Sequence, residues 1–277
     1  MTTRRHALTD DQWALLQPLL PGNRRRGHPY KDHRLVLDGI LWVLSTGAPW
    51  RDLPGDYGPW STVFGRFNRW RHSGRWDQLL TALHAQADAQ GGIDWELFCI
   101  DASVVRAHKA AAGAEQKSAG SGGEPADHAL GRSQGGFGTK VHVVCDGAGR
   151  PLGVVVTPGQ QHESTVFEAA LDTVAVPRPS GQTRRRPQRA AGDMAYNNKR
   201  IRGWLRDRRM GAVIPRPRNQ RRRRFDKVRY RGRNVVERLI GWLKERRRLA
   251  TRFEKLAVNF VAMLKVGMAL WFLKKEL

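Results

Sequence analysis

The sequence predicts a mixed α/β protein, in which an all-helical N-terminal region precedes a sheet flanked by helices. Up to about residue 92, apolar side chains recur at helical spacing, and Pro or Gly separates the stretches. Beyond this point, two strands of a hairpin come first and strands then alternate with helices, an order that indicates a mixed sheet. We therefore expect two domains, 1–92 and 93–277.

The N-terminal region begins with two clear helix signals. Thr9 and Gln12 have the spacing of a capping box, so a helix is expected to start there and to end at Pro21. A second helix is expected over about 32–45, and the Gly-Ala-Pro run at 47–49 is expected to end it.

A third helix is expected from Ser61, whose hydroxyl can cap it. Arg66 and Arg69 are expected on the side of this helix away from its aromatic residues. Short helices with Arg on one of them suggest a helix-turn-helix-like DNA reader, although these Arg residues need contact only phosphates. The aromatic residues recur at helical spacing and are expected in the core: Trp60, Phe64, Phe67 and Trp70.

The first expected strand of the second region is the apolar run 97–100, which ends in Asp101. A loop rich in Ala, Gly and Ser is expected over about 110–136, and its composition is typical of a flexible flap or connector. The runs 140–145 and 151–157 then have the pattern of a β-hairpin.

Further along, the pattern alternates between helix and strand. We expect a helix from about Ser164, a short strand into Asp193, a helix from about Asn198 and a strand over 212–215. The Arg-rich run 216–224 is expected to be a solvated loop that contacts the DNA backbone.

Charge indicates the kind of partner. The 49 Lys and Arg against 25 Asp and Glu give a net charge of +24 and a pI near 11.3, in the range of a nucleic-acid-binding surface. A surface that only keeps the protein soluble would carry interspersed positive and negative residues. Ribosomal-type RNA-binding proteins, in contrast, share this strong positive charge.

Cellular location is predicted from cysteine usage and from the apolar runs. Cys99 and Cys145 are too few for a disulfide framework and are expected as reduced core residues. The apolar run 256–273 contains Asn259 and Lys265, so a buried amphipathic helix is favoured over a membrane span. Without a signal-peptide pattern, we expect a cytoplasmic protein that meets DNA there.

The segment from Tyr230 to Lys244 carries the strongest functional pattern. Tyr230, Arg233, Glu237 and Lys244 lie at steps of three, four and seven residues, which one helix would place on one stripe. The alternative to a catalytic role is a surface ion pair, in which an exposed Glu237 pairs with Arg233. A second stripe is apolar and predicts the buried side: Val236, Leu239, Ile240 and Leu243.

Three carboxylates are candidate metal ligands: Asp101 and Asp193, which end expected strands, and Glu237 on the helix. Hard oxygen ligands of this kind suit Mg²⁺ or Mn²⁺. Two such ions about 4 Å apart could activate a water or a 3′-hydroxyl and stabilise the leaving oxygen. Like charges can hold the carboxylates apart until DNA and metal arrive.

Arg106 and His108 follow Asp101 and are expected either to approach DNA or to be ordinary polar loop residues.

These stretches, together with IDASVVRAHK at 100–109, the long run 131–163 and GDMAY at 192–196, resemble the insertion-sequence-five group of bacterial DDE transposases. The resemblance covers nearly the whole chain. It implies an RNase H-like catalytic domain with Asp101, Asp193 and Glu237 as metal-binding carboxylates. It also implies an N-terminal region that recognises terminal inverted repeats, with Tyr230, Arg233 and Lys244 holding DNA near the metals.

One departure from the resemblance concerns Met194, where relatives often have Lys beside the second carboxylate. Without this Lys a possible phosphate contact is lost, which affects the expected local affinity for DNA and not the expected chemistry. We predict a transposase that cuts the ends of its own element and joins them to target DNA, as a homodimer or a larger assembly on DNA. Two alternatives remain open: a catalytically silent repressor of the element, and a structure-selective nuclease of the same fold.

Overall fold

The computed structural model describes residues 6–22, 31–113, 127–217 and 225–275. Its central feature is a sheet of mixed strand direction, with the strand order β4-β3-β1-β7-β8 through its middle. β3 and β4 form the expected hairpin and run antiparallel to their neighbours, whereas β7 and β8 are parallel to β1. The mixed α/β prediction is confirmed. The main strands are β1 (Leu97–Ala107), β3 (Gly136–Asp146), β4 (Pro151–Pro158), β7 (Arg189–Ala191) and β8 (Gly211–Val213).

Short strands complete the sheet and form one small hairpin. β2 extends β3 at one edge, and β9 pairs with the far end of β1. β5 and β6 pair only with each other. These strands are β2 (Gly131–Ser133), β5 (Val176–Pro177), β6 (Thr183–Arg184) and β9 (Thr251–Arg252).

β1 is longer than the sequence pattern predicted. The expected strand ended at Asp101, but pairing with β3 continues to Arg106, opposite Gly138. The small and β-branched residues after Asp101 fit a pleated strand, which β3 pairs along this stretch and β9 joins only at its end. Asp101 therefore lies in the middle of β1, which is a correction to its predicted place at a strand end.

The described residues of the N-terminal region form four α-helices: α1 (Asp10–Leu16), α2 (His33–Thr46), α3 (Trp60–His72) and α4 (Arg75–Ala89). The Thr9 capping box is confirmed, because its hydroxyl accepts from the backbone of Gln12 and the Gln12 side chain accepts in return. The second helix is also confirmed, with Asp32 as N-cap and Gly47 ending it at φ 72°. Three 3₁₀ turns connect this region: η1 (Gln17–Leu19), η2 (Trp50–Asp52) and η3 (Gly55–Tyr57).

The third helix differs in detail from its prediction. It starts at Trp60, with Pro59 before it and without a side-chain cap, so Ser61 is inside the helix. Proline favours this start because its fixed φ suits the entry to a helix. Phe67 and Trp70 are buried as predicted, whereas Trp60 is 37% exposed.

The remaining helices cover the sheet. α6 packs on β3 and β4, α7 on β8, and α9 on β1 and β3. These are α5 (Lys109–Ala112), α6 (Phe167–Asp172), α7 (Lys199–Asp207), α8 (Lys227–Gly232), α9 (Asn234–Lys244), α10 (Arg247–Ala250) and α11 (Ala257–Lys275). Two more 3₁₀ turns lie near strand ends: η5 (Glu163–Thr165) and η6 (Met194–Tyr196).

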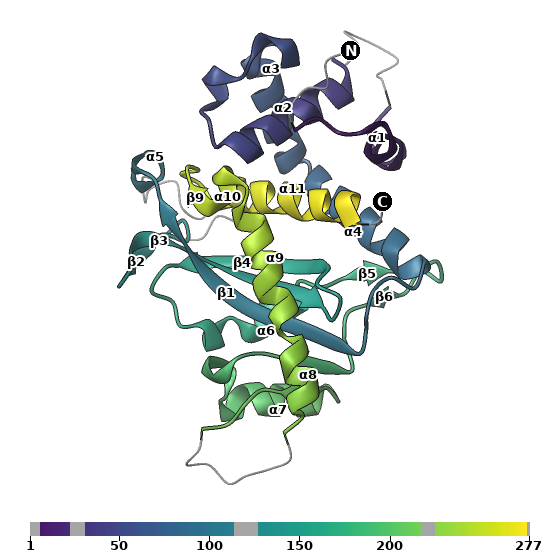
Figure 1. The fold of residues 1–277 in the computed structure, drawn as a ribbon, viewed down its shortest axis with the longest axis vertical. Helices are drawn as coiled ribbons and strands as arrows, with labels where there is room; N and C mark the ends of the chain where they lie inside the picture. Colours follow the sequence, from purple (N-terminus) through teal and green to yellow (C-terminus); the bar gives the residue numbers. More distant parts are fainter. Residues whose placement is uncertain (1–5, 23–30, 114–126, 218–224, 276–277) are drawn as a thin grey trace.

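The expected single helix over Tyr230–Lys244 is two helices. α8 ends at Gly232 and α9 begins at Asn234, with Arg233 between them. Hydrogen bonds of the tighter i to i+3 type span the break, from the Arg233 amide to the Tyr230 carbonyl and from the Val236 amide to the Arg233 carbonyl. The direction of the chain is nearly kept, so α8 and α9 run together across β1 (Figure 1).

α11 lies between the sheet and the N-terminal helices (Figure 1). It packs against β4 on one side and against α1, α2, α3 and α4 on the other. By length and composition it could cross a membrane, but 72% of its most apolar window is buried inside the protein, as in a core helix. The predicted burial is confirmed, although apolar residues surround the helix on all sides instead of forming one stripe.

Two predictions concern residues only partly covered by the structure. Of the loop expected over 110–136, residues 114–126 lie outside the described part, and the described flanks contain α5 and β2. Of the basic run 216–224, residues 218–224 also lie outside it. Cys99 and Cys145 are buried, free and opposite each other in the β1–β3 register, in agreement with their prediction.

Candidate active site

Asp101 is the most central of the predicted carboxylates. Strand alternation places its side chain on the same face of β1 as that of Ser103, and the Asp101 side chain is 19% exposed. Burial raises the pKa of Asp101 above its ordinary value, and the charges of Asp193 and Glu163 raise it further. The neighbouring Arg233 guanidinium acts in the opposite direction. The net effect is a carboxylate whose negative charge is poorly compensated.

Asp193 lies beside Asp101 because β7 and β1 are parallel neighbours. The last paired residues are Ala191 and Cys99, and each carboxylate follows two residues later, Asp101 within β1 and Asp193 just beyond β7. Asp193 is also the N-cap of η6, where its carboxylate accepts from the Ala195 amide at 2.9 Å. The structure thus brings together two of the three predicted ligands.

Arg233 joins Glu237 to this pair. Its guanidinium lies 3.4 Å from Asp101 and donates to Glu237 one helical turn later. The Arg233 side chain is 12% exposed, whereas that of Glu237 is 52% exposed. Burial disfavours the guanidinium charge, but Asp101 and Glu237 outweigh that effect and raise the pKa of Arg233. The carboxylates therefore surround a buried cation supplied by the protein.

The other two residues of the helical pattern flank this cluster. Lys244 turns inward and donates to the Ser103 hydroxyl at 2.6 Å and to the Val104 carbonyl at 3.2 Å. Burial lowers the pKa of Lys244. The ring of Tyr230 lies beneath the Arg233 guanidinium, 5.8 Å from its central carbon. The structure therefore places Tyr230, Arg233 and Glu237 together, with Lys244 farther along β1.

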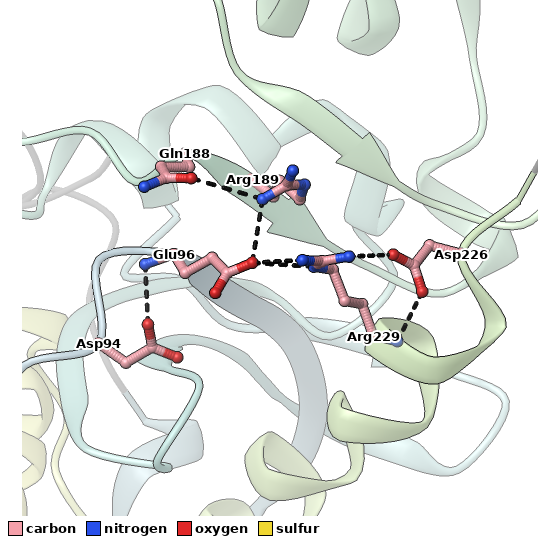
Figure 2. A network of polar contacts seen from close by, with 6 residues as sticks. All are labelled: Asp94, Glu96, Gln188, Arg189, Asp226 and Arg229. Atoms are coloured by element: carbon pink, nitrogen blue, oxygen red, sulfur yellow. Dashed lines mark hydrogen bonds and ion pairs between the residues drawn. The ribbon is translucent and has the colours of Figure 1, made fainter.

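A polar network fixes α8, which precedes Arg233, against the start of β1 (Figure 2). Glu96 accepts from Arg189 at 3.1 Å and from Arg229 at 2.5 Å and 3.1 Å. Arg229 also pairs with Asp226, the N-cap of α8, at 2.5 Å. The network thus connects the beginnings of β1, β7 and α8, the three elements that lead to the carboxylate cluster.

The remaining predicted DNA contacts lie apart from the carboxylates. Arg106 is exposed on β1, and alternation places it on the face opposite Asp101. His108 is exposed, caps α5 and stacks on Phe253 with ring centroids 4.9 Å apart. Arg69 is exposed on α3.

Arg66 is in a different environment from that expected. Its side chain is 5% exposed and hydrogen-bonds to the His33 ring at 2.6 Å, inside the N-terminal helices. The guanidinium also lies 5.8 Å from the centroid of the Trp70 ring. This burial is at odds with a phosphate contact by Arg66 in the free protein.

Sequence reasoning missed two residues at the cluster, Glu163 and Tyr196. Each of them is the last residue of a stretch that resembles the family. Both are far from Asp101 along the chain, so the sequence did not indicate that they lie near it. Glu163 acts on the charge of Asp101, and both Glu163 and Asp101 act on the hydroxyl of Tyr196. Only the fold brings the three together.

The donor chemistry fits a hard divalent cation. Asp101 on β1 and Asp193 just beyond β7 offer carboxylate oxygens, and their mutual repulsion is what a cation would relieve. Across the described part of the chain, however, no three His, Cys, Asp or Glu side chains form a group able to hold a metal. Arg233 lies between Asp101 and Glu237, so Glu237 must leave it to become the third ligand.

Comparison with known proteins matches both regions of the chain. Residues 8–80 match the family described as "Putative transposase of IS4/5 family", and residues 95–272 match the transposase DDE domain. The uncharacterized protein y4sN of Sinorhizobium fredii is 39% identical over 115 residues, which are 41% of this chain and 86% of that protein. An uncharacterized 16.2 kDa protein of insertion element IS402 from Burkholderia cepacia is 39% identical over 107 residues, 36% of this chain and 73% of that protein.

The DDE match spans the whole central sheet, from β1 through β8, and continues through α9 into α11. The mixed sheet with flanking helices is the RNase H-like architecture expected for such a domain. The sequence match, the strand order and the adjacent Asp101 and Asp193 agree. The chain therefore belongs to the DDE transposase family of bacterial insertion sequences.

Proposed function

We propose that this transposase binds the terminal inverted repeats of its own insertion sequence, cleaves DNA at the element ends and joins the freed 3′-hydroxyls to target DNA. The observation that carries the proposal is the convergence of Asp101, Asp193 and Glu237 around Arg233. Three carboxylates, from β1, from the turn after β7 and from α9, can share a cation, whereas each alone would have an ordinary surface or core role.

Asp101, Asp193 and Glu237 would hold Mg²⁺ or Mn²⁺, two ions in the working site. Bound there, the metal would lower the pKa of the attacking water and stabilise the leaving oxygen of the phosphodiester. The protein's own contribution is to hold the carboxylates on rigid strands and on α9. Rigid placement matters because small errors in position cost large factors in rate.

Arg233 has a second role in this proposal. In the free protein it neutralises Asp101 and Glu237, which would otherwise repel each other. A cation bound by these carboxylates would replace its charge, and the guanidinium could then pair with a DNA phosphate. Tyr230 stacks against it and would limit the directions in which it can move.

DNA binding would extend beyond the carboxylates. The net charge of +24 supports broad contact with phosphates, and the exposed Arg69 and Arg106 would add to it from α3 and β1. Recognition of the inverted repeats is assigned to the helical region 1–92, and catalysis to 93–277. Two element ends must be cut and joined, so a homodimer or a larger assembly on DNA in the cytoplasm is part of the proposal.

The test is cleavage of end-labelled duplexes that carry the element's own termini, with Mg²⁺ or with EDTA. We expect the wild-type chain to nick at the terminus only with Mg²⁺, and Glu237→Gln to bind the ends without cutting. Glu245→Gln is the matched control, because Glu245 is an exposed carboxylate just beyond α9.

Other outcomes would favour the alternatives. End binding without cutting by the wild-type chain and by Glu237→Gln would indicate a silent DNA-binding protein. Equal cutting of duplexes that lack the termini would indicate a structure-selective nuclease. Either result would overturn the proposal.

A further inference from the structure

Tyr196 has a buried hydroxyl for which the described residues supply no hydrogen-bond partner. The residue is 0% exposed, and its ring packs against Phe167 with centroids 5.3 Å apart. A phenol buried in this way normally donates to a partner, because a buried polar group without one is costly. The unpaired hydroxyl therefore points to a ligand or to a rearranged side chain in the working state.

The charges around this hydroxyl belong to the candidate active site. Burial raises the pKa of Tyr196, and the carboxylates of Glu163, Asp101 and Asp193 raise it further. Arg233 acts in the opposite direction. The phenol therefore stays protonated and can donate a hydrogen bond to a carboxylate oxygen.

The backbone holds Tyr196 and Asp193 in one rigid turn. Asp193 caps η6 and Tyr196 ends it, with the Tyr196 amide 3.3 Å from the Asp193 carbonyl. Gly192 precedes the turn, where a Cβ would lie 2.7 Å from a ring carbon of Tyr196. The close fit leaves the ring no room on that side, so the hydroxyl is directed by the same turn that directs the second carboxylate.

Glu163 reaches the same place from another element. It begins η5, which contacts η6, and its side chain is 22% exposed. Its carboxylate lies 3.4 Å from the Lys140 ammonium, which also donates to the Gln161 carbonyl at 2.8 Å. β3 and η5 thus hold a fourth carboxylate whose charge acts on Asp101 and on the Tyr196 hydroxyl.

We propose that Tyr196 and Glu163 are positioning residues of the metal site, in which the Tyr196 hydroxyl donates into the carboxylate cluster and Glu163 adds a fourth negative charge. This inference rests on the proposed metal-dependent function. Groups that orient metal ligands typically change metal affinity by about 10- to 100-fold when they are removed.

The test is direct binding of Mn²⁺ to the full chain, followed by the loss of the free-ion electron paramagnetic resonance signal. We expect Tyr196→Phe and Glu163→Gln each to weaken binding by about 10-fold or more. Tyr196→Phe should melt at the same temperature as the wild type or higher, because it removes an unpaired buried hydroxyl. The matched controls are Tyr57→Phe, a buried Tyr of η3, and Glu245→Gln; both should bind like the wild type.

Asp101→Asn separates this inference from the proposed function. If Asp101→Asn loses binding but Tyr196→Phe and Glu163→Gln bind within twofold of the wild type, the positioning roles are wrong and the metal site stands. If only one of these two variants binds normally, the role of that residue is wrong. If the wild type and Asp101→Asn bind equally weakly, the carboxylate metal site itself is overturned, and this inference with it.

Discussion

Asp101 shows how one residue serves function at a cost to folding. Its carboxylate is half-buried, faces two other carboxylates and has a single close cation, Arg233, at 3.4 Å among the described residues. The result is a raised pKa, so the charged form is less favourable in the folded protein than in the unfolded chain. Active sites commonly keep such groups because the bound cation or substrate compensates them.

Asp101→Asn should abolish nicking and leave the protein equally stable or more stable at pH 7. A raised pKa means that the folded protein binds more protons than the unfolded chain between the two pKa values, so stability falls as pH rises through that window. The variant removes this penalty, with about 2–4 °C in Tm expected for each kcal/mol. The gain should shrink at acid pH, where the carboxyl is protonated both in the folded protein and in the unfolded chain.

Thermal melting at pH 7 and pH 4 measures this effect. Asp172→Asn, at the exposed end of α6, is the control for the loss of one negative charge. A Tm several degrees below the wild type at pH 7 would mean that the ion pair with Arg233 outweighs burial.

At the scale of elements, α8 and α9 show both the strength and the limit of periodicity. The three- and four-residue steps correctly predicted that Tyr230, Arg233 and Glu237 share one side. They did not predict the break at Arg233, because a stripe pattern does not record whether each turn closes over three or four residues. The break gives the buried Arg233 a place between the two helices.

Arg229→Met should weaken the attachment of α8 to the start of β1. Because α8 leads directly to Arg233, we expect the nicking rate to fall by about 10-fold. The change removes the pairs with Glu96 and Asp226 in Figure 2. These groups are exposed, so the Tm should change little. Nicking rates and Tm of Arg229→Met are compared with those of Arg206→Met, an exposed Arg on α7 whose side chain is 82% exposed. Equal nicking by both variants would show that the network has no role in placing α8.

Gly138 sets the distance between β1 and β3. A Cβ at Gly138 would lie 2.4 Å from the Val105 carbonyl oxygen, a backbone atom that cannot move without disturbing the sheet. Gly138→Ala should therefore lower the free energy of unfolding by about 1–3 kcal/mol, as overpacking typically does.

The control for this change is Gly65→Ala on α3. A Cβ at Gly65 meets no atom within 4 Å, so alanine should stabilise the helix by about 0.5–1 kcal/mol. Urea unfolding of both variants gives the comparison. A stable Gly138→Ala would show that β1 and β3 can separate without cost.

At the scale of the whole molecule, α11 connects the two regions of the chain. It contacts the four N-terminal helices and β4, and α10 packs on α2. Arg248 on α10 is buried, pairs with Glu254 at 2.6 Å and donates to the Ala48 carbonyl at 3.1 Å. The N-terminal helices therefore share their core with the C-terminal end of the catalytic region.

Two buried histidines should make the whole protein sensitive to acid. His84 on α4 donates to the Pro151 carbonyl at 2.9 Å, and His142 on β3 shares a hydrogen bond with Thr157 at 2.8 Å. Burial lowers the pKa of each to about 4 from 6.5. The unfolded chain then binds more protons between pH 6.5 and 4, so stability is lost as pH falls through this window.

At pH 5, each histidine should cost roughly 2 kcal/mol of unfolding free energy relative to pH 7. His84→Gln and His142→Gln should each remove that part of the pH dependence, regardless of how much they change the free energy of unfolding at neutral pH. Denaturant unfolding at both pH values measures it, with His72→Gln on the exposed surface of α3 as control. Parallel pH dependence in the variants and the wild type would contradict the assignment to these side chains.

Fold class, the helices α1 and α2, the β3–β4 hairpin and the charge suited to a polyanion could all be predicted from the sequence. Capping, periodicity and charge are local or additive properties, so they can be read without the fold. The sequence also supplied the residues of the DDE pattern, through resemblance rather than physics. The full length of β1 could not be read in this way, because it depends on pairing with β3 over Asp101 to Arg106.

Which of these residues lie in contact depends on the tertiary structure. The burial of Arg66 against His33, the inward turn of Lys244 to Ser103 and the position of Arg233 between two carboxylates all depend on partners far away in the chain. The same holds for Tyr196 and Glu163, which reach the cluster from separate turns. Such contacts depend on how strands and helices pack in three dimensions, and no spacing along the sequence records that packing.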